Sequence, residues 1–226
     1  AREPYELEYR LRTKSGAVKW VWERGRGVHD ERGALVALEG FVSDITARKE
    51  AERRFAAFAA LGHRLNTVRT AAEAGEIIVA AADALFAWDG CSLLLYSPER
   101  DRVRPVLCKD VVAGRRCDCL ESTEEVAPGV RTRRVLERGP ELTLRREPVT
   151  MAEDSIPFGD TARPSASLMH VPVHDGERIT AILSIQSYRL DAYTEADLQT
   201  LQQLADHCGG ALHRIAEEES RLRAEA

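Results

Sequence analysis

Residues 182–215 read ILSIQSYRLDAYTEADLQTLQQLADHCGGALHRI, and this stretch changes from one type of secondary structure to another. Its first residues are mainly apolar, which is typical of a buried strand. Thr194 and Asp197 then form the pattern of a capping box, which marks the start of a helix. The stretch therefore predicts a central strand followed by a long closing helix that begins at Thr194.

The preceding residues predict an antiparallel sheet with helices around it. A capping-box pattern at Thr70–Glu73 begins one helix, and the segments CSLLLY and RVRPVL form a hairpin. SLMHVPV and RITAILSIQ form a second hairpin, with Asp175-Gly176 as its turn. Residues 108–166 are irregular, apart from a short helix near 130–138 and a strand at ELTLR. This order of elements indicates an α+β fold with a central antiparallel sheet.

The strand, the acidic leucine-rich helix and the small-residue patch of 182–215 resemble the end of a GAF domain. LGHRLNTVRTAAEAGEIIVAAADALFAWDGCSLLLY is similar to the opening of that family, and the resemblance covers residues 53–216. It implies a central antiparallel sheet flanked by helices, in a sensory or dimerisation module of bacterial signalling proteins, commonly upstream of a histidine kinase. It identifies neither a ligand nor a cofactor, because function resides in the site rather than in the fold.

The first 46 residues predict a three-stranded antiparallel meander. In YELEYRLRT, apolar and charged residues alternate with the period of a half-buried strand, and two further strands follow after turns. Three such strands bury too little apolar surface to fold alone. With the switch from strand to helix at SDIT, residues 4–50 resemble the C-terminal (PAC) part of a PAS domain. We expect the rest of that domain to precede Ala1, in a longer protein, so this chain should lack a working PAS ligand site.

A charged helix joins the two parts. Asp44 and Thr46 stand where the last strand of the meander gives way to this signalling helix, and their side chains can cap its first-turn amides. We therefore divide the chain into a truncated PAS part at 1–46, a linker or signalling helix at 47–66, a GAF domain at 53–216, and the start of a coiled-coil output helix at 217–226.

Composition is typical of a globular cytoplasmic protein. Of the 226 residues, 44% are hydrophobic and 31% are charged, which is enough to build a core. A formal charge of −5 without a compact Lys/Arg cluster argues against nucleic-acid binding. We find no signal peptide and no apolar run of membrane-spanning length. The five cysteines are irregularly spaced, unlike a secreted disulfide framework. We predict a cytoplasmic protein without membrane or nucleic-acid partners.

Three cysteines fall in the irregular region where GAF domains commonly form their ligand pocket, and we take them as candidates for lining it: Cys108, Cys117 and Cys119. Their thiols could serve in metal binding or redox sensing. The paired spacing of a structural zinc site is missing, so we expect no metal. His170 and His174 could share one face of a strand, where a surface or core role is favoured over a ligand role.

Enzymes of the same fold provide the main alternative. Free methionine sulfoxide reductases also use the GAF fold, and the spacing of Cys108 and Cys117 is similar to theirs. However, no further cysteine occurs between Cys119 and Cys208, and GRRCDC lacks the Gly-Cys-Gly turn of that family. GHRLNTV at 62–68 departs from a kinase phospho-acceptor motif, and no nucleotide-binding loop follows it. We predict a noncatalytic chain, with a reductase or a thiol or metal redox sensor as the alternative.

The closing helix carries an apolar seam at spacings of three and four residues, which is typical of a coiled coil. Beyond Arg214 the apolar stripe narrows to the seam alone, and a narrow seam is stable only when another helix covers it. We therefore predict a parallel homodimer in which the following residues pair: Leu198, Leu201, Ala205, Cys208, Leu212, Ile215 and Leu222. The alternative is a helix that packs only on its own sheet.

Together these features predict a noncatalytic sensory relay in a larger bacterial signal-transduction protein. A two-component sensor histidine kinase is the favoured whole protein. In this hypothesis an unknown small molecule in the GAF pocket biases paired helices, and these helices act on a covalently linked output domain.

Overall fold

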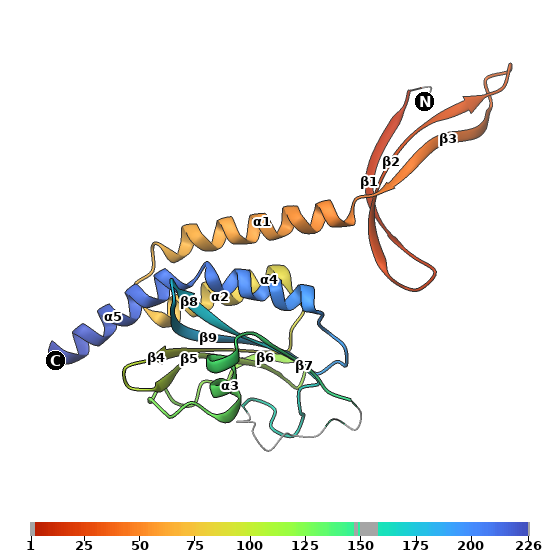
Figure 1. Ribbon diagram of the computed structural model, residues 1–226. Coiled ribbons are helices and arrows are strands. Elements are labelled where there is room, and N and C mark those ends of the chain that lie inside the picture. Colours follow the sequence, from red (N-terminus) through yellow and green to blue (C-terminus); the bar gives the residue numbers. More distant parts are fainter. Residues whose placement is uncertain (1–2, 147–148, 150–157, 226) are drawn as a thin grey trace. The chain divides into compact units, whose positions relative to one another are not determined.

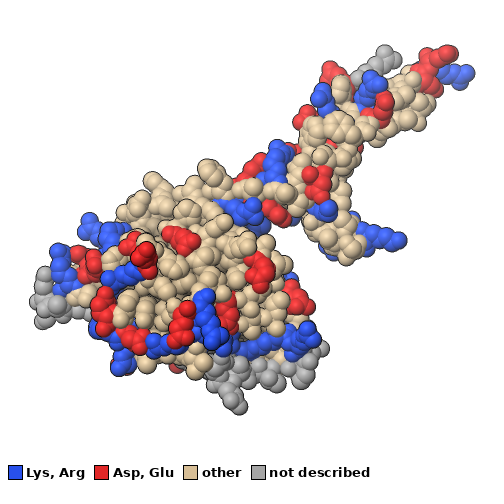
Figure 2. Space-filling view, viewed as in Figure 1, with Lys and Arg blue, Asp and Glu red and all other residues tan. Residues whose placement is uncertain are grey.

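The computed structural model describes residues 3–146, 149 and 158–225 (Figure 1). The chain forms two compact units, Ala1–Ala56 and Ala57–Ala226. Acidic and basic side chains are interspersed over the visible face of the second unit (Figure 2). Within the described part of the chain, no helix is both long enough and apolar enough to span a membrane.

The first unit contains the predicted three-stranded meander. Strands β1 (Tyr5–Arg12), β2 (Val18–His29) and β3 (Leu35–Asp44) pair antiparallel in the order β1-β2-β3. The tight turns between them place Gly16 and Gly33 at positive φ, which glycine adopts without steric cost. All ten residues of β3 are exposed. The sheet therefore buries little of its apolar surface within the described part of this unit, as three strands alone would predict.

Helix α1 (Thr46–Leu65) begins directly after β3, and the two predicted joint residues have different partners. The carboxylate of Asp44 accepts a hydrogen bond from the backbone N–H of Thr46 at 3.0 Å, so it satisfies a first-turn amide. Lys19, followed by Thr46, holds the pKa of Asp44 below its ordinary value. The Thr46 hydroxyl instead accepts from the backbone N–H of Trp20 in β2 at 3.0 Å. Asp44 thus contacts the helix start, and Thr46 ties the helix to the sheet.

The second unit has the predicted α+β fold around a six-stranded antiparallel sheet in the order β6-β5-β4-β9-β8-β7. Helix α2 (Ala71–Leu85) precedes the hairpin of β4 (Gly90–Ser97) and β5 (Arg102–Val112), and the second hairpin is β8 (Ser167–Asp175) and β9 (Arg178–Ser187). Between the hairpins lie α3 (Val130–Arg138), β7 (Glu141–Leu144) and β6 (Arg115–Asp118), of which only β6 was not predicted.

Helices cover the two faces of this sheet unequally. The second half of α1, together with α2, α4 (Glu195–Asp206) and α5 (Gly209–Glu225), lies on one face, and α3 is the one described helix on the other (Figure 1). The large apolar core fills the space between the helical layer and the sheet. The opposite face is consequently left with room between the strands and α3, and the candidate site lies there.

The predicted single closing helix is wrong, because the chain forms two helices with a break at His207 and Cys208. The predicted capping box at Thr194 and Asp197 is present at the start of α4. At the start of α5, a Cβ atom on Gly209 would lie 1.7 Å from the carbonyl oxygen of His174. The chain passes so close to β8 that only glycine fits at this position.

The predicted dimer seam is also wrong for six of its seven residues. These six are at most 7% exposed and belong to the core of their own unit: Leu198, Leu201, Ala205, Cys208, Leu212 and Ile215. Leu222 is the exception, at 55% exposure. A helix that covers its own sheet needs the same spacing of apolar residues as a coiled coil, and here the sheet and α2 supply the cover.

Candidate ligand-binding cavity

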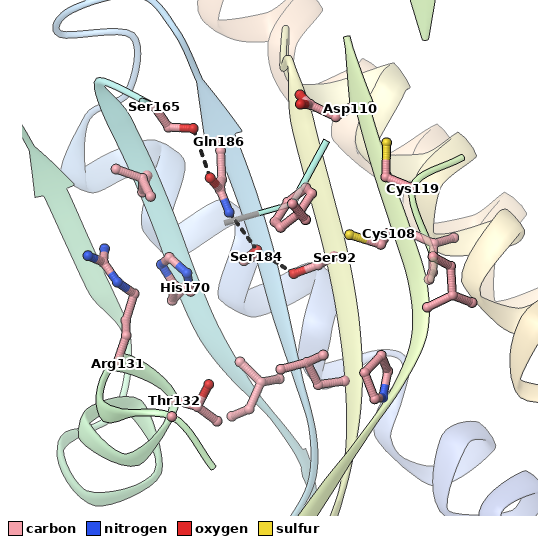
Figure 3. Close-up of a pocket in the computed structure, with 18 of the residues that line it drawn as sticks. Ser92, Cys108, Asp110, Cys119, Arg131, Thr132, Ser165, His170, Ser184 and Gln186 are labelled. Atoms are coloured by element: carbon pink, nitrogen blue, oxygen red, sulfur yellow. Dashed lines mark hydrogen bonds between the residues drawn. The ribbon is translucent and has the colours of Figure 1, made fainter. Parts of the chain in front are cut away.

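A cavity of about 340 Å³ lies between the sheet and α3, a volume that suits one small molecule. Strands β4, β5, β8 and β9 form its floor. Residues 119–127, which follow β6, and residues 158–165, which precede β8, contribute to its walls. Figure 3 shows side chains from these segments directed into the same space. The GAF pocket expected from the sequence therefore has a physical counterpart here.

A row of polar side chains crosses the floor of the cavity, and we call it the polar row: Cys108, Ser92, Ser184 and His170. Ser92 lies directly opposite Cys108 on β5 and Ser184 on β9, and Ser184 lies opposite His170 on β8. Residues directly opposite on neighbouring strands place their side chains on the same face of the sheet. Strand register alone therefore aligns these four groups (Figure 3).

Hydrogen bonds extend the polar row along β9. The hydroxyl oxygens of Ser92 and Ser184 are 2.8 Å apart, and Gln186 Nε2 lies 3.5 Å from the Ser184 oxygen. The side-chain oxygen of Gln186, Oε1, accepts a hydrogen bond from the Ser165 hydroxyl at 2.9 Å. The chain of contacts thus joins the floor to the wall formed by residues 158–165 (Figure 3).

His170 is the most unusual member of the polar row. Burial first, and then the positive charge of Arg131, lowers the pKa of His170 to about 3, so its imidazole is neutral near pH 7. Its Nδ1 atom is buried and has no hydrogen-bond partner among the described residues. Buried polar atoms nearly always have a partner, so the His170 imidazole, which lines the cavity, has hydrogen-bonding capacity left for a ligand.

A buried carboxylate organises one end of the cavity. Asp110 on β5 is 2% exposed, and its Oδ2 atom accepts from the Tyr188 hydroxyl and from the backbone N–H of Asp160, each at 2.7 Å. Burial, and then the bond to Asp110, raises the pKa of Tyr188. The Arg163 guanidinium stacks 4.0 Å above the Tyr188 ring. The segment 158–163 is therefore anchored on β5 and on Tyr188, which directly follows β9.

The three candidate cysteines divide between two environments. Cys108 and Cys119 line the cavity, and the backbone N–H of Cys119 donates to the Cys108 carbonyl at 2.7 Å. Cys117 is exposed and is not among the lining residues. Burial is the main cause that raises the pKa of the Cys108 and Cys119 thiols, which disfavours the reactive thiolate. Among the residues described, no group of three or more His, Cys, Asp or Glu side chains is placed to hold a metal.

Sequence reasoning missed most of this site. It named Cys108 and Cys119, favoured a structural role for His170, and did not single out Ser92, Ser184 or Asp110. The signal in the sequence is the alternation of apolar and polar residues along β9. There the buried Leu183 and Ile185 alternate with Ser184 and Gln186. In a central strand covered on both faces, polar residues at every second position mark a polar cavity rather than solvent.

Gly159 offers a test of how tightly the wall is anchored. It has φ of +65°, and a Cβ atom there would lie 2.1 Å from Asp110 Oδ2. Gly114 has a similar φ of +77° with nothing within 4 Å of such an atom, so Gly114→Ala is the matched control for backbone strain. We expect Gly159→Ala to lower the free energy of unfolding by about 1–3 kcal/mol more than Gly114→Ala, because the added methyl group overpacks the site.

Urea denaturation measures this difference, and hydrogen exchange at the Asp160 amide reports whether the wall has detached. If the two variants match in both measurements, the wall is not anchored through Asp110.

Comparisons with known proteins agree with this architecture. The PAS fold family matches residues 1–42, and the GAF domain family matches residues 68–213, more than half of the chain. A methyl sulfide methyltransferase-associated sensor of Methanosarcina acetivorans is 29% identical over 102 residues, which are 45% of this chain and 10% of the sensor. The chain thus spans about a tenth of the length of this curated relative.

Two solved structures share the fold at low sequence identity. The GAF domain of a phosphoenolpyruvate-protein phosphotransferase from Acinetobacter is 15% identical, with a TM-score of 0.57 over 73% of this chain and 95% of that one. Free methionine-R-sulfoxide reductase from Neisseria meningitidis, solved with its substrate, is 17% identical, with a TM-score of 0.55 over 75% and 93% of the two chains. The chain belongs to the GAF domain family, and the end of a PAS fold precedes that domain in a sensory signalling module.

Proposed function

We propose that the chain is a noncatalytic sensory relay, in which a small molecule bound in the cavity alters helix α5, and α5 acts on a covalently linked output domain. A cytoplasmic sensor histidine kinase is the favoured whole protein. The PAS and GAF families and the sensor relative support the sensory role. The contact between the cavity wall and α5 provides the mechanism.

That contact is an ion pair between Arg104 on β5 and Glu219 on α5. Val103 and Pro105, the chain neighbours of Arg104, line the cavity. Arg104 Nη2 lies 2.5 Å from Glu219 Oε2, and the two side chains are only 14% and 20% exposed. Solvent and salt screen a partly buried pair less than an exposed one. A displacement of β5 by a ligand therefore acts on α5 through this pair.

The same carboxylate also holds the start of α2. Glu219 Oε1 accepts from the backbone N–H of Ala71 at 2.9 Å, and Ala71 is the first residue of that helix. One turn earlier on α5, Arg214 Nη2 donates to the carbonyl of Leu65 at 3.3 Å, where α1 ends. Helix α5 thus contacts the end of α1, the start of α2 and the cavity strand β5. These contacts suit a helix that responds both to changes in α1 and to a ligand in the cavity.

Glu219→Gln tests this connection without any ligand. The variant keeps an oxygen for the Ala71 amide but loses the charge that attracts Arg104. We expect faster hydrogen exchange in α5 and also in β5 at residues 102–106, because these elements are no longer held together.

Glu218→Gln is the matched control, since among the residues that the structure describes Glu218 pairs only with Arg221, within α5. It should leave exchange in β5 unchanged. Equal effects of the two variants on β5, or no effect of either, would show that Glu219 does not connect the cavity wall to α5.

We further propose that the protein is a homodimer, with contacts on the exposed part of α5 rather than on its buried seam. Leu222 is exposed on that part, and a hydrophobic side chain there favours pairing with a second helix. Sedimentation should give a dimer that Leu222→Asp weakens while the circular dichroism spectrum stays unchanged. A wild-type monomer at high micromolar concentration contradicts this proposal.

The noncatalytic part of the proposal concerns Cys108 and Cys119. Their thiols face the cavity in a chain whose fold is shared with a sulfoxide reductase, but burial keeps them protonated. We expect the purified protein to show no turnover of free methionine sulfoxide with a dithiol reductant, and no autophosphorylation with ATP. Sustained reduction that disappears in Cys108→Ser would overturn the noncatalytic assignment in favour of the reductase.

A further inference from the structure

The cavity floor changes in chemical character from one end to the other. At one end, Leu94 lies directly opposite Pro105 and Ile182, so this part of the floor is apolar. The uncharged polar row follows two residues further along the strands. At the other end lie Asp110 and Gln186, close to Gly90 between them. A ligand that fills the cavity therefore contacts apolar side chains at one end, and at the other end it contacts Asp110 and Gln186 beside the apolar Leu168.

The two serines of the polar row leave one proton for a ligand. Each hydroxyl carries one proton, and one of the two is used in the 2.8 Å contact between Ser92 and Ser184. Gln186 Nε2 is a donor, so its contact with Ser184 uses no hydroxyl proton. No other acceptor for the second proton is found within the described residues. The pair consequently offers one donor to a ligand acceptor such as a carbonyl oxygen.

His170 offers the complementary group beside this donor. It lies directly opposite Ser184, and its Nδ1 atom is buried without a partner among the described residues. Side chains in such positions are about 5 Å apart at their Cβ atoms, a spacing that the oxygen and nitrogen of one amide group can bridge. A neutral imidazole can accept an N–H or donate to a C=O, depending on its tautomer, so an amide matches it in either state.

The charged side chains around the cavity do not favour a charged ligand. Among the described residues, three acidic and three basic side chains line it: Asp110, Glu121, Asp160, Arg131, Arg145 and Arg163. The Asp110 carboxylate already accepts from Tyr188 and Asp160, and Arg163 stacks on Tyr188. Arg131 and Arg145 both have interaction partners of their own. An ion placed on the polar row would lose its hydration, and Arg131, whose positive charge acts on His170, already donates a hydrogen bond to Thr143.

We propose that the cavity binds an uncharged carboxamide or lactam with an apolar body. Its carbonyl oxygen accepts from the Ser92 and Ser184 pair, its N–H faces His170, and its apolar body rests on Leu94 and Ile182. This inference rests on the proposed function, because it specifies the ligand of the same sensory cavity.

Three naphthalene probes of similar shape test the ligand class by calorimetry at pH 7.5: 2-naphthamide, 2-naphthoate and 2-naphthylmethylammonium. We expect 2-naphthamide to bind one to one and about tenfold or more tighter than either charged probe, because only the amide satisfies the polar row without burying a charge. Tighter binding of a charged probe, or no binding of any probe, overturns the ligand class.

Variants then locate the binding groups. Ser184→Ala and His170→Leu should each weaken 2-naphthamide binding about fivefold to tenfold, because one hydrogen bond is lost in each. Ser97→Ala, on the same strand as Ser92 but outside the lining residues, is the control and should change nothing. The serine variants remove a single oxygen, and thermal melts verify that they fold. Unchanged affinity in both Ser184→Ala and His170→Leu would place the probe elsewhere.

The outcome also separates this inference from the relay. If 2-naphthamide binds on the polar row but hydrogen exchange in α5 stays the same, the ligand class stands and the relay fails. If the charged probe is preferred and exchange in α5 changes on binding, the relay stands and the ligand class fails.

Discussion

Both faces of the central sheet in the second unit are covered. One face is covered by apolar packing against helices, and the other lines a partly polar cavity. One face packs against α2, α4 and α5 through a continuous apolar core that includes Leu183 and Ile185. The other faces α3 across a cavity, where Ser184 and Gln186 alternate with those same residues along β9. Because strand side chains alternate between faces, one short sequence supplies both a core and a polar binding floor.

In the proposed relay, a small molecule on one face of the sheet acts on helices that pack against the opposite face. A ligand in the cavity contacts the same strands whose opposite face supports α5, and packed elements transmit displacements because interiors are close to crystal density. Arg104 adds a specific connection, since it leaves β5 between two cavity-lining residues and reaches Glu219. The proposed relay therefore needs no large rearrangement, only a shift of β5 that changes the position or order of α5.

Local patterns in the sequence predicted the elements that depend on neighbouring residues. The Asp175-Gly176 turn, the capping box at Thr194 and Asp197, and the short helix α3 are all present, since each depends on residues a few positions apart. Contacts between distant segments left no such pattern. Arg104 and Glu219 are separated by 115 positions, and the polar row exists only because four strands pair in one register.

The closing helices show a different limit. Their spacing of three and four residues was read as a dimer seam, but packing on the same chain requires the same spacing. The close approach of Gly209 to His174, which breaks the helix and sets the direction of α5, involves a contact between segments far apart in the sequence. Periodicity identifies the buried face of a helix, but it does not identify what buries that face.

In the proposed relay, Arg104 and Glu219 act as one unit that joins the cavity wall to α5. A double-mutant cycle measures this directly, from the free energies of unfolding in urea of the wild type, Arg104→Met, Glu219→Gln and the double variant. The account predicts a coupling energy of about 1 kcal/mol or more, because removing either partner leaves the other partly buried charge unpaired. Effects that add to within about 0.3 kcal/mol would show that the two side chains are energetically independent, which contradicts the account.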